Sequence, residues 1–565
     1  MSMTCEALSP ACARGRGLQD GEPVKSIRTQ QALTGYCLRA WPTHGARKHW
    51  RRAQDRDDNA KLLCPRRRVH SRFIMPPHFR PRRTLLGACV LALTVCATTS
   101  SAQAVLQPRD LAEHAMRGSA GSLEKLRVAA GGGDASAEFW LGTYFDSEHH
   151  FEQAAAWYRR AAQQGFAQGQ YALGVLYAGG QGLASDDGQA ATWFAKAAMQ
   201  GNVLAQTNLG LLYERGVGVH QDDGKAAFWF SKAAQQGNAL AQTHLGLLYR
   251  RGQGMQRDDA KAAAWIAKAA EQGMSQAQQI LGAMYVRGQG LPQDPAQGAR
   301  WLQKAAQQGN ALAQDQLGLL YKNGLGVQRS NERAANWLAK AAAQGVPDAQ
   351  DNLGWLYANG FGVPQSYTQA AAWYRKAADK GVVDAEFSFG WLLEKGYGVA
   401  QDDAQAATWY RKAASHGEAH AQNNLGLLYE HGRGVSRDDV QAAQWFLRSA
   451  LQGEANAQYN LGSLYARGLG VPQSLVIAYA LDSVSAQSDP STTNHAVRAL
   501  AKLRPELSTT QLQAAIQLAG EAARPANLGP ALDAYAKASG MELSSGANGS
   551  GTREGHVAVQ AGATP

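Results

Sequence analysis

Apolar residues recur at helical spacing within segments that asparagine and glycine bound. One such segment begins at Asn238, a favourable N-cap, and ends at Gly252. Four apolar residues within it fall on one helical face: Ala241, Leu245, Leu248 and Tyr249. Beyond the loop that starts at Gly252, Asp258 can cap a second helix that ends at Gly273, where a left-handed residue is expected. The pattern predicts a helix–turn–helix unit, whose two members we call helix A and helix B.

This unit repeats along the chain with a period of 36 residues. The glycine of a Leu-Gly pair in helix A recurs at this step, and so does a tryptophan in helix B. The glycines are Gly174, Gly210, Gly246, Gly282, Gly318, Gly354, Gly390, Gly426 and Gly462. The tryptophans are Trp157, Trp193, Trp229, Trp265, Trp301, Trp337, Trp373, Trp409 and Trp445. A fixed period of this length is typical of a solenoid, in which each unit packs mainly against its neighbours.

From Trp193 onward, the residue seven positions before each tryptophan is a good helix N-cap. These residues, together with the equivalent one in the last unit, are Asp186, Asp222, Asp258, Asp294, Ser330, Ser366, Asp402, Asp438 and Ser474. The pattern also predicts that a glycine such as Gly246 lets a neighbouring helix approach closely. A tryptophan such as Trp265 or Trp373 is expected to fill the space between helices.

These motifs resemble the Sel-one-like repeat (SLR) family, relatives of the tetratricopeptide repeat. The matching pattern is A-x-x-x-L-G-x-L-Y-x-x-G-x-G-V followed by D-x-x-x-A-A-x-W-x-x-K-A-A-x-x-G, and it covers about residues 136–487. The resemblance implies an all-α fold, a right-handed α/α superhelical solenoid of about ten 36-residue helix-turn-helix repeats. It also implies a scaffold or adaptor that binds protein or peptide segments, commonly in the cell envelope. Two units depart from the pattern, at Leu141-Gly142 and at Leu481, and both are expected to cap the array.

The segments on both sides of the repeats are expected to cover their open ends. Residues 105–135 look like a degenerate unit and predict N-terminal capping helices. Residues 488–538 contain two helix starts, Asp489-Pro490 and the capping box Ser508–Gln511, and so predict two C-terminal capping helices. The Gly, Ser and Ala content of residues 539–565 predicts a disordered tail.

The first 104 residues combine an export signal with an upstream extension. Met75 precedes a basic stretch, a 13-residue apolar run and Ala102-Gln103-Ala104, so we predict a signal peptide over residues 75–104 with cleavage after Ala104. Pro81–Leu86 resembles the twin-arginine export motif, and general secretion is the other route. Residues 1–74 would bury a signal that works only near a terminus, so we expect them to be a mis-assigned, disordered extension. The expected location is periplasmic or extracellular, in a bacterium.

Charge and cysteine usage agree with this division. The chain has a formal net charge of +11, but residues 1–104 hold 18 of its 56 Lys and Arg and 6 of its 45 Asp and Glu. Residues 105–565 therefore carry 38 basic and 39 acidic residues, a balance that gives no reason to expect nucleic acid as a partner. All six cysteines precede the cleavage point, so the mature chain has no disulfide and no cysteine nucleophile. No segment reaches the roughly 20 apolar residues that a membrane-spanning helix needs.

The repeats hold no motif that predicts catalysis. Ser122-Leu123-Glu124-Lys125 fits the Ser-x-x-Lys motif of penicillin-recognising enzymes, but no companion Lys-Thr-Gly or Ser-Asp-Asn motif exists. Some cysteine-rich secreted SLR relatives have been labelled β-lactamases, so a secreted hydrolase of the β-lactamase-like or cell-wall-acting type is the alternative function. Near one predicted helix junction stand three histidines that are candidate metal ligands: His416, His420 and His431. We expect them to be surface residues instead. We predict no catalytic residue, no cofactor and no metal.

A row of basic residues follows helix B, three positions after each tryptophan. Its members are Arg160, Lys196, Lys232, Lys268, Lys304, Lys340, Lys376, Lys412 and Arg448. Each lies near a helix C-terminus, where a cation complements the helix dipole. We interpret this row as a solvated outer surface rather than as a nucleic-acid site.

The side of helix A opposite the core is more apolar than a plain solvent face. The position after the Leu-Gly pair lies at about 200° from the leucine and includes Leu211, Leu247, Leu319, Trp355, Trp391 and Leu427. Two further rows flank it, with Phe387 and Tyr459 three residues before the glycine and Arg215, Arg251, Arg287, Lys395 and Arg467 five residues after it. An apolar row with a basic border predicts a groove for an extended or helical partner segment. The alternative is that the leucines pack against helix A of the next unit, whereas Trp355 and Trp391 are expected to be exposed.

Overall fold

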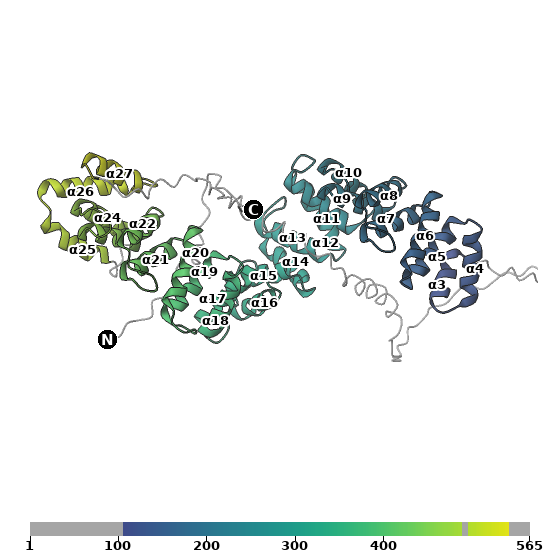
Figure 1. The fold of residues 1–565 in the computed structure, drawn as a ribbon, viewed down its shortest axis with the longest axis horizontal. Helices are drawn as coiled ribbons and strands as arrows, with labels where there is room; N and C mark the ends of the chain where they lie inside the picture. The colour runs from purple at the N-terminus through teal and green to yellow at the C-terminus, as the bar shows by residue number, and fades with distance from the viewer. Residues whose placement is uncertain (1–105, 489–494, 542–565) are drawn as a thin grey trace, which may run out of the picture. The chain divides into compact units, whose positions relative to one another are not determined.

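The 36-residue units fold as pairs of α-helices that pack against each other. The computed structural model describes residues 106–488 and 495–541, and within them it contains 25 α-helices and no strand. Figure 1 shows these helices from α3 to α27 in chain order. The predicted all-α, α/α solenoid is therefore confirmed. The predicted signal peptide, its cleavage site at Ala104 and most of the predicted tail lie outside the described residues.

Ten repeats each contribute one helix A and one helix B. The helices A are α5 (Ala135–Ser147), α7 (Ala167–Gly179), α9 (Val203–Arg215), α11 (Ala239–Arg251), α13 (Ser275–Arg287), α15 (Ala311–Asn323), α17 (Pro347–Asn359), α19 (Val383–Lys395), α21 (Ala419–His431) and α23 (Ala455–Arg467). The helices B are α6 (Phe151–Gln163), α8 (Asp187–Met199), α10 (Asp223–Gln235), α12 (Asp259–Glu271), α14 (Pro295–Gln307), α16 (Asn331–Ala343), α18 (Tyr367–Ala378), α20 (Asp403–Ser415), α22 (Asp439–Ala450) and α24 (Leu475–Ser488).

The predicted helix boundaries are confirmed by the caps. The side chain of Asn238 accepts a hydrogen bond from the backbone N–H of Ala241 at 2.9 Å. The side chain of Asp258 likewise accepts one from the backbone N–H of Lys261 at 2.8 Å. The equivalent aspartates and serines cap the other helices B from α8 to α24. Gly252, which ends α11, has a φ of 68° that a residue with a side chain rarely adopts.

The second glycine of each loop allows two repeats to approach closely. Gly254 has a φ of 67°, and a Cβ at this position would overlap the backbone of Asp223. Asp223 is the first residue of α10 in the preceding repeat. The loop of one repeat therefore packs against the N-terminus of the preceding helix B.

The core of each repeat contains the residue after the tryptophan, and not the tryptophan itself. Phe230 is fully buried, and a Cβ on Gly210 would lie 2.7 Å from its ring, so the glycine of helix A makes room for this side chain. The equivalent residues in the other repeats are also buried: Tyr158, Phe194, Ile266, Leu302, Leu338, Tyr374, Tyr410, Phe446 and Asp482. The prediction that Trp265 and Trp373 fill the space between helices is confirmed in part, because both are half-buried and pack against the edge of a core cluster rather than inside it. Neighbouring residues on a helix lie about 100° apart, so only one of the two can face helix A.

The tryptophans are covered by the basic row of helix B. Lys268 Nζ lies 4.1 Å from the ring centroid of Trp265, and Lys412 Nζ lies 3.7 Å from that of Trp409. Trp229 is an exception, because Lys232 lies over Phe228 instead, at 5.6 Å. A cation–π contact at an exposed site contributes about 0.5–1 kcal/mol. The basic row is thus part of the outer surface of the helices B.

A row of buried glutamines joins consecutive repeats, and the sequence analysis did not identify it. The side-chain amide of Gln206 donates to the carbonyl oxygen of Ala198 at 3.0 Å, and its carbonyl oxygen accepts from Gln236 Nε2 at 2.8 Å. Glutamines four positions before the Leu-Gly glycine make this glutamine row: Gln170, Gln206, Gln242, Gln278, Gln314, Gln350, Gln422 and Gln458. Each buried amide bonds to a carbonyl at the end of the preceding helix B, which locks two repeats together.

Further helices pack on both ends of the repeats. The helices α3 (Pro108–Met116) and α4 (Ala120–Gly131) contact α5. At the other end, α24 contacts α25 (His495–Leu503) and α26 (Thr509–Ala522), and α26 contacts α27 (Leu528–Ala538). The capping box of Ser508 and Gln511 is confirmed at the start of α26. The sequence predicts two helices here and the structure has three, because Gly529 and Pro530 conceal α27, whose Leu528 and Leu532 are buried.

Candidate binding face

The exposed sides of the helices A form a surface that continues from one repeat to the next, which we call the helix-A face. Neighbouring helices A touch each other, as α9 touches α11 and α13 touches α15. Polar side chains also bridge them. Gln279 on α13 donates to Gln316 on α15 at 2.8 Å, and Lys322 on α15 donates to Asn352 on α17 at 2.9 Å. This face therefore offers a partner side chains from several repeats at once.

The apolar row predicted on this face is only partly available to a partner. Leu211, Leu319 and Leu427 are half-buried, and Leu247 is buried, with 8% of its surface exposed. Leu211 packs against a core cluster formed by α10 of its own repeat and α11 of the next, and Leu247 lies in a cluster with residues of α13. Both interpretations of the leucines therefore hold in part, since each side chain fills a gap between repeats and most leave one side open.

The two tryptophans of this row are half-buried, so the prediction that they are exposed is wrong. The ring of Trp355 lies 5.2 Å from that of Phe361, and Lys322 Nζ lies 4.4 Å from its centroid. The ring of Trp391 lies 5.2 Å from that of Tyr397. Large flat side chains at these positions gain contact area by folding onto the following loop. Each still contributes surface to the helix-A face.

The two aromatic residues predicted beside this row occupy different environments. Phe387 is half-buried, and its ring lies 5.9 Å from those of Tyr410 and His420. Tyr459 lies two repeats further on, with its ring 5.8 Å from that of His495 in α25. The structure therefore does not bring Phe387 and Tyr459 together in one site.

The predicted basic border is exposed and falls into two groups. Lys395 pairs with Glu394 at 2.9 Å, and Arg467 pairs with Glu430. The three others form no ion pair with a residue that the structure describes: Arg215, Arg251 and Arg287. They end α9, α11 and α13, so unbalanced positive charge gathers in three successive repeats.

Four aspartates lie on the next three helices A, and helical spacing alone did not single them out. Asp315 lies on α15, Asp348 and Asp351 lie on α17, and Asp384 lies on α19; we call them the acidic patch. The pKa of Asp315 is raised to about 7, mainly by burial and also by the nearby carboxylate of Asp348. Burial, with Asp384 and Asp348 nearby, raises the pKa of Asp351 to about 7 as well. The available signal was the appearance of aspartate at positions that hold leucine, glutamine or threonine in the preceding repeats.

The three histidines considered as metal ligands do not form one site. His416 Nδ1 lies 3.2 Å from a carboxylate oxygen of Glu386, and His420 Nδ1 lies 3.0 Å from one of Glu418. The hydrogen bond to Glu418 raises the pKa of His420. In the part of the chain that the structure describes, no group of three or more His, Cys, Asp or Glu residues could hold a metal ion.

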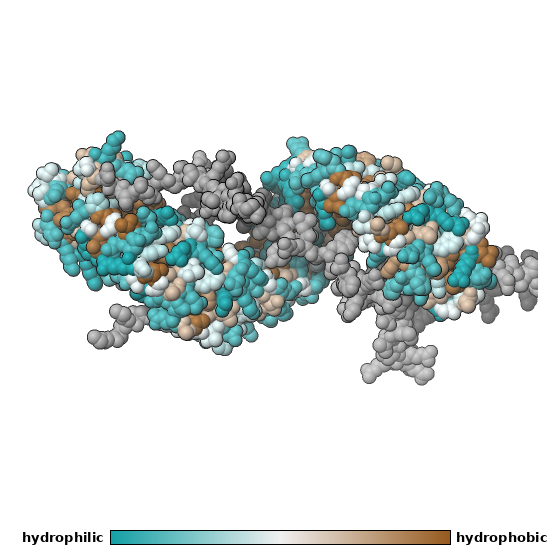
Figure 2. Space-filling view, viewed as in Figure 1, coloured by the Kyte–Doolittle hydropathy of each residue, from teal (hydrophilic) through white to brown (hydrophobic). Residues whose placement is uncertain are grey.

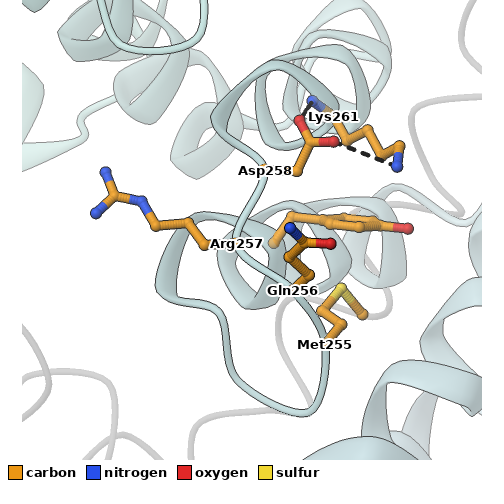
Figure 3. A pocket seen from close by; sticks show the side chains of 6 residues that line it. Met255, Gln256, Arg257, Asp258 and Lys261 are labelled. Carbon is orange, nitrogen blue, oxygen red and sulfur yellow. Dashed lines mark hydrogen bonds and ion pairs between the residues drawn. The ribbon is translucent and has the colours of Figure 1, made fainter.

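A shallow pocket lies at the loop between α11 and α12 (Figure 3). Tyr249, Met255 and Gln256 line it together with an ion pair, in which Lys261 Nζ lies 3.2 Å from Asp258 Oδ2. The same arrangement recurs in another repeat, where Lys225 pairs with Asp222 at 3.3 Å and lies over the ring of Tyr213. This pocket is therefore a feature of the repeat and not a special site.

The Ser-x-x-Lys motif is part of a helix start. Ser119 caps α4, and the hydroxyl groups of Ser119 and Ser122 are hydrogen-bonded at 2.9 Å. Ser122 is buried and Lys125 is exposed. The hydroxyl of Ser122 thus serves the cap of α4, and its burial leaves it poorly placed for a substrate.

Ten segments of the chain match the Sel1 repeat model: residues 135–166, 167–202, 203–238, 239–274, 275–310, 311–346, 347–382, 383–418, 419–454 and 455–481. The chain belongs to the Sel1 repeat family. Its Sel1 repeats are similar to those of c5321, a protective antigen of uropathogenic Escherichia coli with an SLR fold, at 32% sequence identity and a TM-score of 0.53. That match covers 77% of this chain and 99% of c5321.

A Sel1 repeat protein from Oxalobacter formigenes is 36% identical, with a TM-score of 0.45, and the match covers 57% of this chain and 95% of the other. No curated protein matches the chain significantly. The Sel1 repeat solenoid is a scaffold fold typical of proteins that interact with other proteins, and generally not of enzymes. Nothing in these matches favours a hydrolase.

The described helices include none that is long and apolar enough to cross a membrane. In the view of Figure 2, hydrophobic residues form small separate patches between hydrophilic ones. A partner would therefore be recognised by apolar and charged side chains together.

Proposed function

We propose that this protein is an exported bacterial scaffold that binds segments of partner proteins in a groove along its helix-A face. The observation that carries the proposal is the contrast between the two kinds of helix. On most helices B the half-buried tryptophan is covered by a cation from its own helix, as Lys268 covers Trp265. On the helices A, Leu211 is half-buried and lies one helical turn before Arg215, which forms no ion pair with a described residue, and the row continues through half-buried residues such as Leu319 and Leu427. An apolar row with a charged border is what a peptide segment needs for affinity and specificity.

Selection of peptides from a random display library by the full chain tests the binding function. Leu319→Glu places a charge in the row, and we expect it to abolish binding of the selected peptides. Val128→Glu is the matched control, because Val128 on α4 has 68% of its surface exposed and lies outside the row. If the selected peptides bind the Leu319→Glu protein normally, the helix-A face is not the binding surface.

Export is the second part of the proposal, and it rests on the sequence of residues 75–104. Mass spectrometry of the protein from the native host should find an N-terminus at Val105 in the periplasmic or extracellular fraction. Peptides from residues 1–74, or a cytoplasmic protein that retains the apolar run, would contradict it.

The alternative, a secreted hydrolase, has no observation in its favour. Its nearest motif contains Ser122, whose hydroxyl is held by the cap of α4. Incubation of the full chain with a chromogenic β-lactam should give no hydrolysis above the uncatalysed rate. Hydrolysis that disappears in the Ser122→Ala variant would establish the alternative.

A further inference from the structure

One residue of each helix A lies three positions before the Leu-Gly glycine. In most repeats where this residue is polar, its side chain forms hydrogen bonds within the protein. Asn460 donates to Asn423 of the preceding repeat at 2.9 Å, and Gln279 donates to Gln316 of the following one. Thr207 and Thr243 donate to carbonyl oxygens of their own helices. Polar groups on this face thus normally find partners within the protein, as buried polar groups do.

The acidic patch breaks this rule. Asp315 has 8% of its surface exposed, and its buried Oδ1 accepts no hydrogen bond. Among the residues that the structure describes, no cation lies within 4.0 Å of any of the four carboxylates of the acidic patch. The cation that acts on Asp315 and Asp351 is Lys322, and it is engaged elsewhere, between Asn352 and the ring of Trp355. A buried carboxylate without a partner costs stability, which suggests that its partner comes from another molecule.

The carboxylates of the patch also act on one another. Asp348 raises the pKa of Asp315, and Asp348 and Asp384 both raise the pKa of Asp351. The pKa of Asp384 is raised by burial, by Glu418 and by Asp348. A positive group placed among these carboxylates would reverse these shifts and favour the ionised forms.

The chemistry of the patch indicates the kind of cation. The described residues include no group with the geometry of a metal site, so an organic cation fits better than a metal ion. Two aspartates of the patch lie three positions before a Leu-Gly glycine. Each of them lies one helical turn before an apolar residue of the helix-A face, Asp315 before Leu319 and Asp351 before Trp355. A bound segment would therefore meet carboxylates and an apolar surface side by side.

We propose that the acidic patch binds the ammonium or guanidinium group of a lysine or arginine in the partner segment, while an apolar neighbour of that residue contacts Leu319 and Trp355. The partner is thus a basic, partly apolar peptide segment. This inference rests on the proposed function, because it assigns the chemistry of one part of the same face. It also gives a direction to the segment, since acidic residues of the same partner would meet the unpaired Arg251 and Arg287 in the preceding repeats.

Fluorescence anisotropy with two synthetic peptides tests the inference on the full chain. One labelled peptide alternates lysine with leucine, and the other alternates glutamate with leucine. The double variant Asp348→Asn/Asp351→Asn removes two patch charges with little change in side-chain volume. The control Glu271→Gln/Glu332→Gln removes two charges from exposed positions on helices B. We expect the patch variant to bind the lysine peptide about tenfold more weakly and the control to bind it as the unchanged protein does.

The affinity for the lysine peptide should also rise between pH 6 and pH 8, because Asp315 and Asp351 ionise in this range. Equal weakening by the patch and control variants would mean attraction to net charge alone and would overturn the inference. If Leu319→Glu abolishes binding while the patch variant binds normally, the groove stands and the cation site does not. If neither change matters, both proposals fail. A thermal melt of each variant establishes that it is folded.

Discussion

Gln350 and Asp351 are neighbours on α17, yet they belong to two regions of opposite character. The amide of Gln350 faces helix B and donates to the carbonyl oxygen of Ala342 at 3.0 Å, as its counterparts do along the glutamine row. Asp351 faces the neighbouring helices A, where its pKa is raised because it meets burial and other carboxylates. The glutamine row satisfies its side-chain amides within the protein, with Oε1 of Gln350 as the exception, whereas the carboxylates of the acidic patch form no ion pair with a described residue.

This difference separates scaffold from site. A buried polar group with partners stabilises one arrangement of the repeats, so the glutamine row can recur without serving any ligand. A buried polar group without partners lowers stability, and a protein retains it where another molecule supplies the partner. Asp315 differs in this respect from Asp482, which also lacks a partner but is buried in the core of the last repeat, because Asp315 lies one helical turn before Leu319 on the helix-A face.

The largest expected effect is on the core that both regions share. Phe230→Ala removes a fully buried ring that packs on Gly210, and it should lower the free energy of unfolding by about 3–5 kcal/mol. Trp229→Ala, one residue earlier, removes a half-buried ring and should cost clearly less. Chemical denaturation of both variants measures the difference. Equal losses of free energy of unfolding in the two variants would show that the tryptophans belong to the core.

The sequence predicted the repeat period, the helix boundaries and the caps, because these depend on residues within each unit, such as the N-cap residues and the glycines that end the helices. It was only partly right about the tryptophans, whose rings pack against the edge of the core and not inside it. On most helices B the ring is also covered by a cation three residues later, as Lys376 Nζ lies 4.0 Å from the ring centroid of Trp373. The buried position beside it varies between Phe, Tyr, Ile and Leu, because several apolar shapes fill the same space.

The candidate site was predictable only in part. The positions of Leu319 and Trp355 on one face follow from helical spacing, but their half-burial depends on how closely the next repeat approaches. The same holds for Asp315, whose missing partner cannot be read from one helix. The glutamine row left a signal that was overlooked, since Gln206 and Gln236 recur with the period of 36 residues.

The second prediction concerns the hydrogen bonds of the glutamine row. Gln314 donates to the carbonyl oxygen of Ala306 and accepts from Gln344 at 2.7 Å, so Gln314→Ala should cost about 1–3 kcal/mol. Gln350 makes the first bond, but its Oε1 accepts none, because Lys380 stands where most other repeats have glutamine and bonds to the carbonyl oxygen of Gly345. Gln350→Ala should therefore cost less by about 1 kcal/mol in the same denaturation experiment. A larger loss for Gln350→Ala would contradict the role assigned to the row.

A third prediction concerns Asp482, a carboxylate in the core of the last repeat. Asp482 is 2% exposed, and its Oδ1 has no partner. Burial raises its pKa to about 8, so the folded chain holds a proton that the unfolded chain has lost between about pH 4 and pH 8. The free energy of unfolding should therefore fall as the pH rises through this window.

Asp482→Leu restores the apolar residue that other repeats have here, such as Leu302 and Leu338. It should stabilise the C-terminal repeats by about 1–3 kcal/mol, with more gain at pH 8 than at pH 5. Thermal melts at the two pH values measure this. A gain that does not change with pH would show that Asp482 titrates normally.

The smallest expected effect on stability comes from the acidic patch. Asp348→Asn/Asp351→Asn removes repulsion between carboxylates, so the melting temperature should stay equal or rise slightly at pH 8. A clear drop in the melting temperature would place these aspartates among the groups that hold the fold together.

Photo-crosslinking tests most directly the central claim that partner segments bind the helix-A face at the acidic patch. A photoreactive phenylalanine analogue replaces Leu319 on α15 or, as the control, Met199 at the end of α8, which has 77% of its surface exposed. Each protein is irradiated with the lysine–leucine peptide. The account predicts a crosslinked product with the analogue at position 319 and almost none at position 199. Equal products at both positions, or a product at position 199 alone, would contradict it.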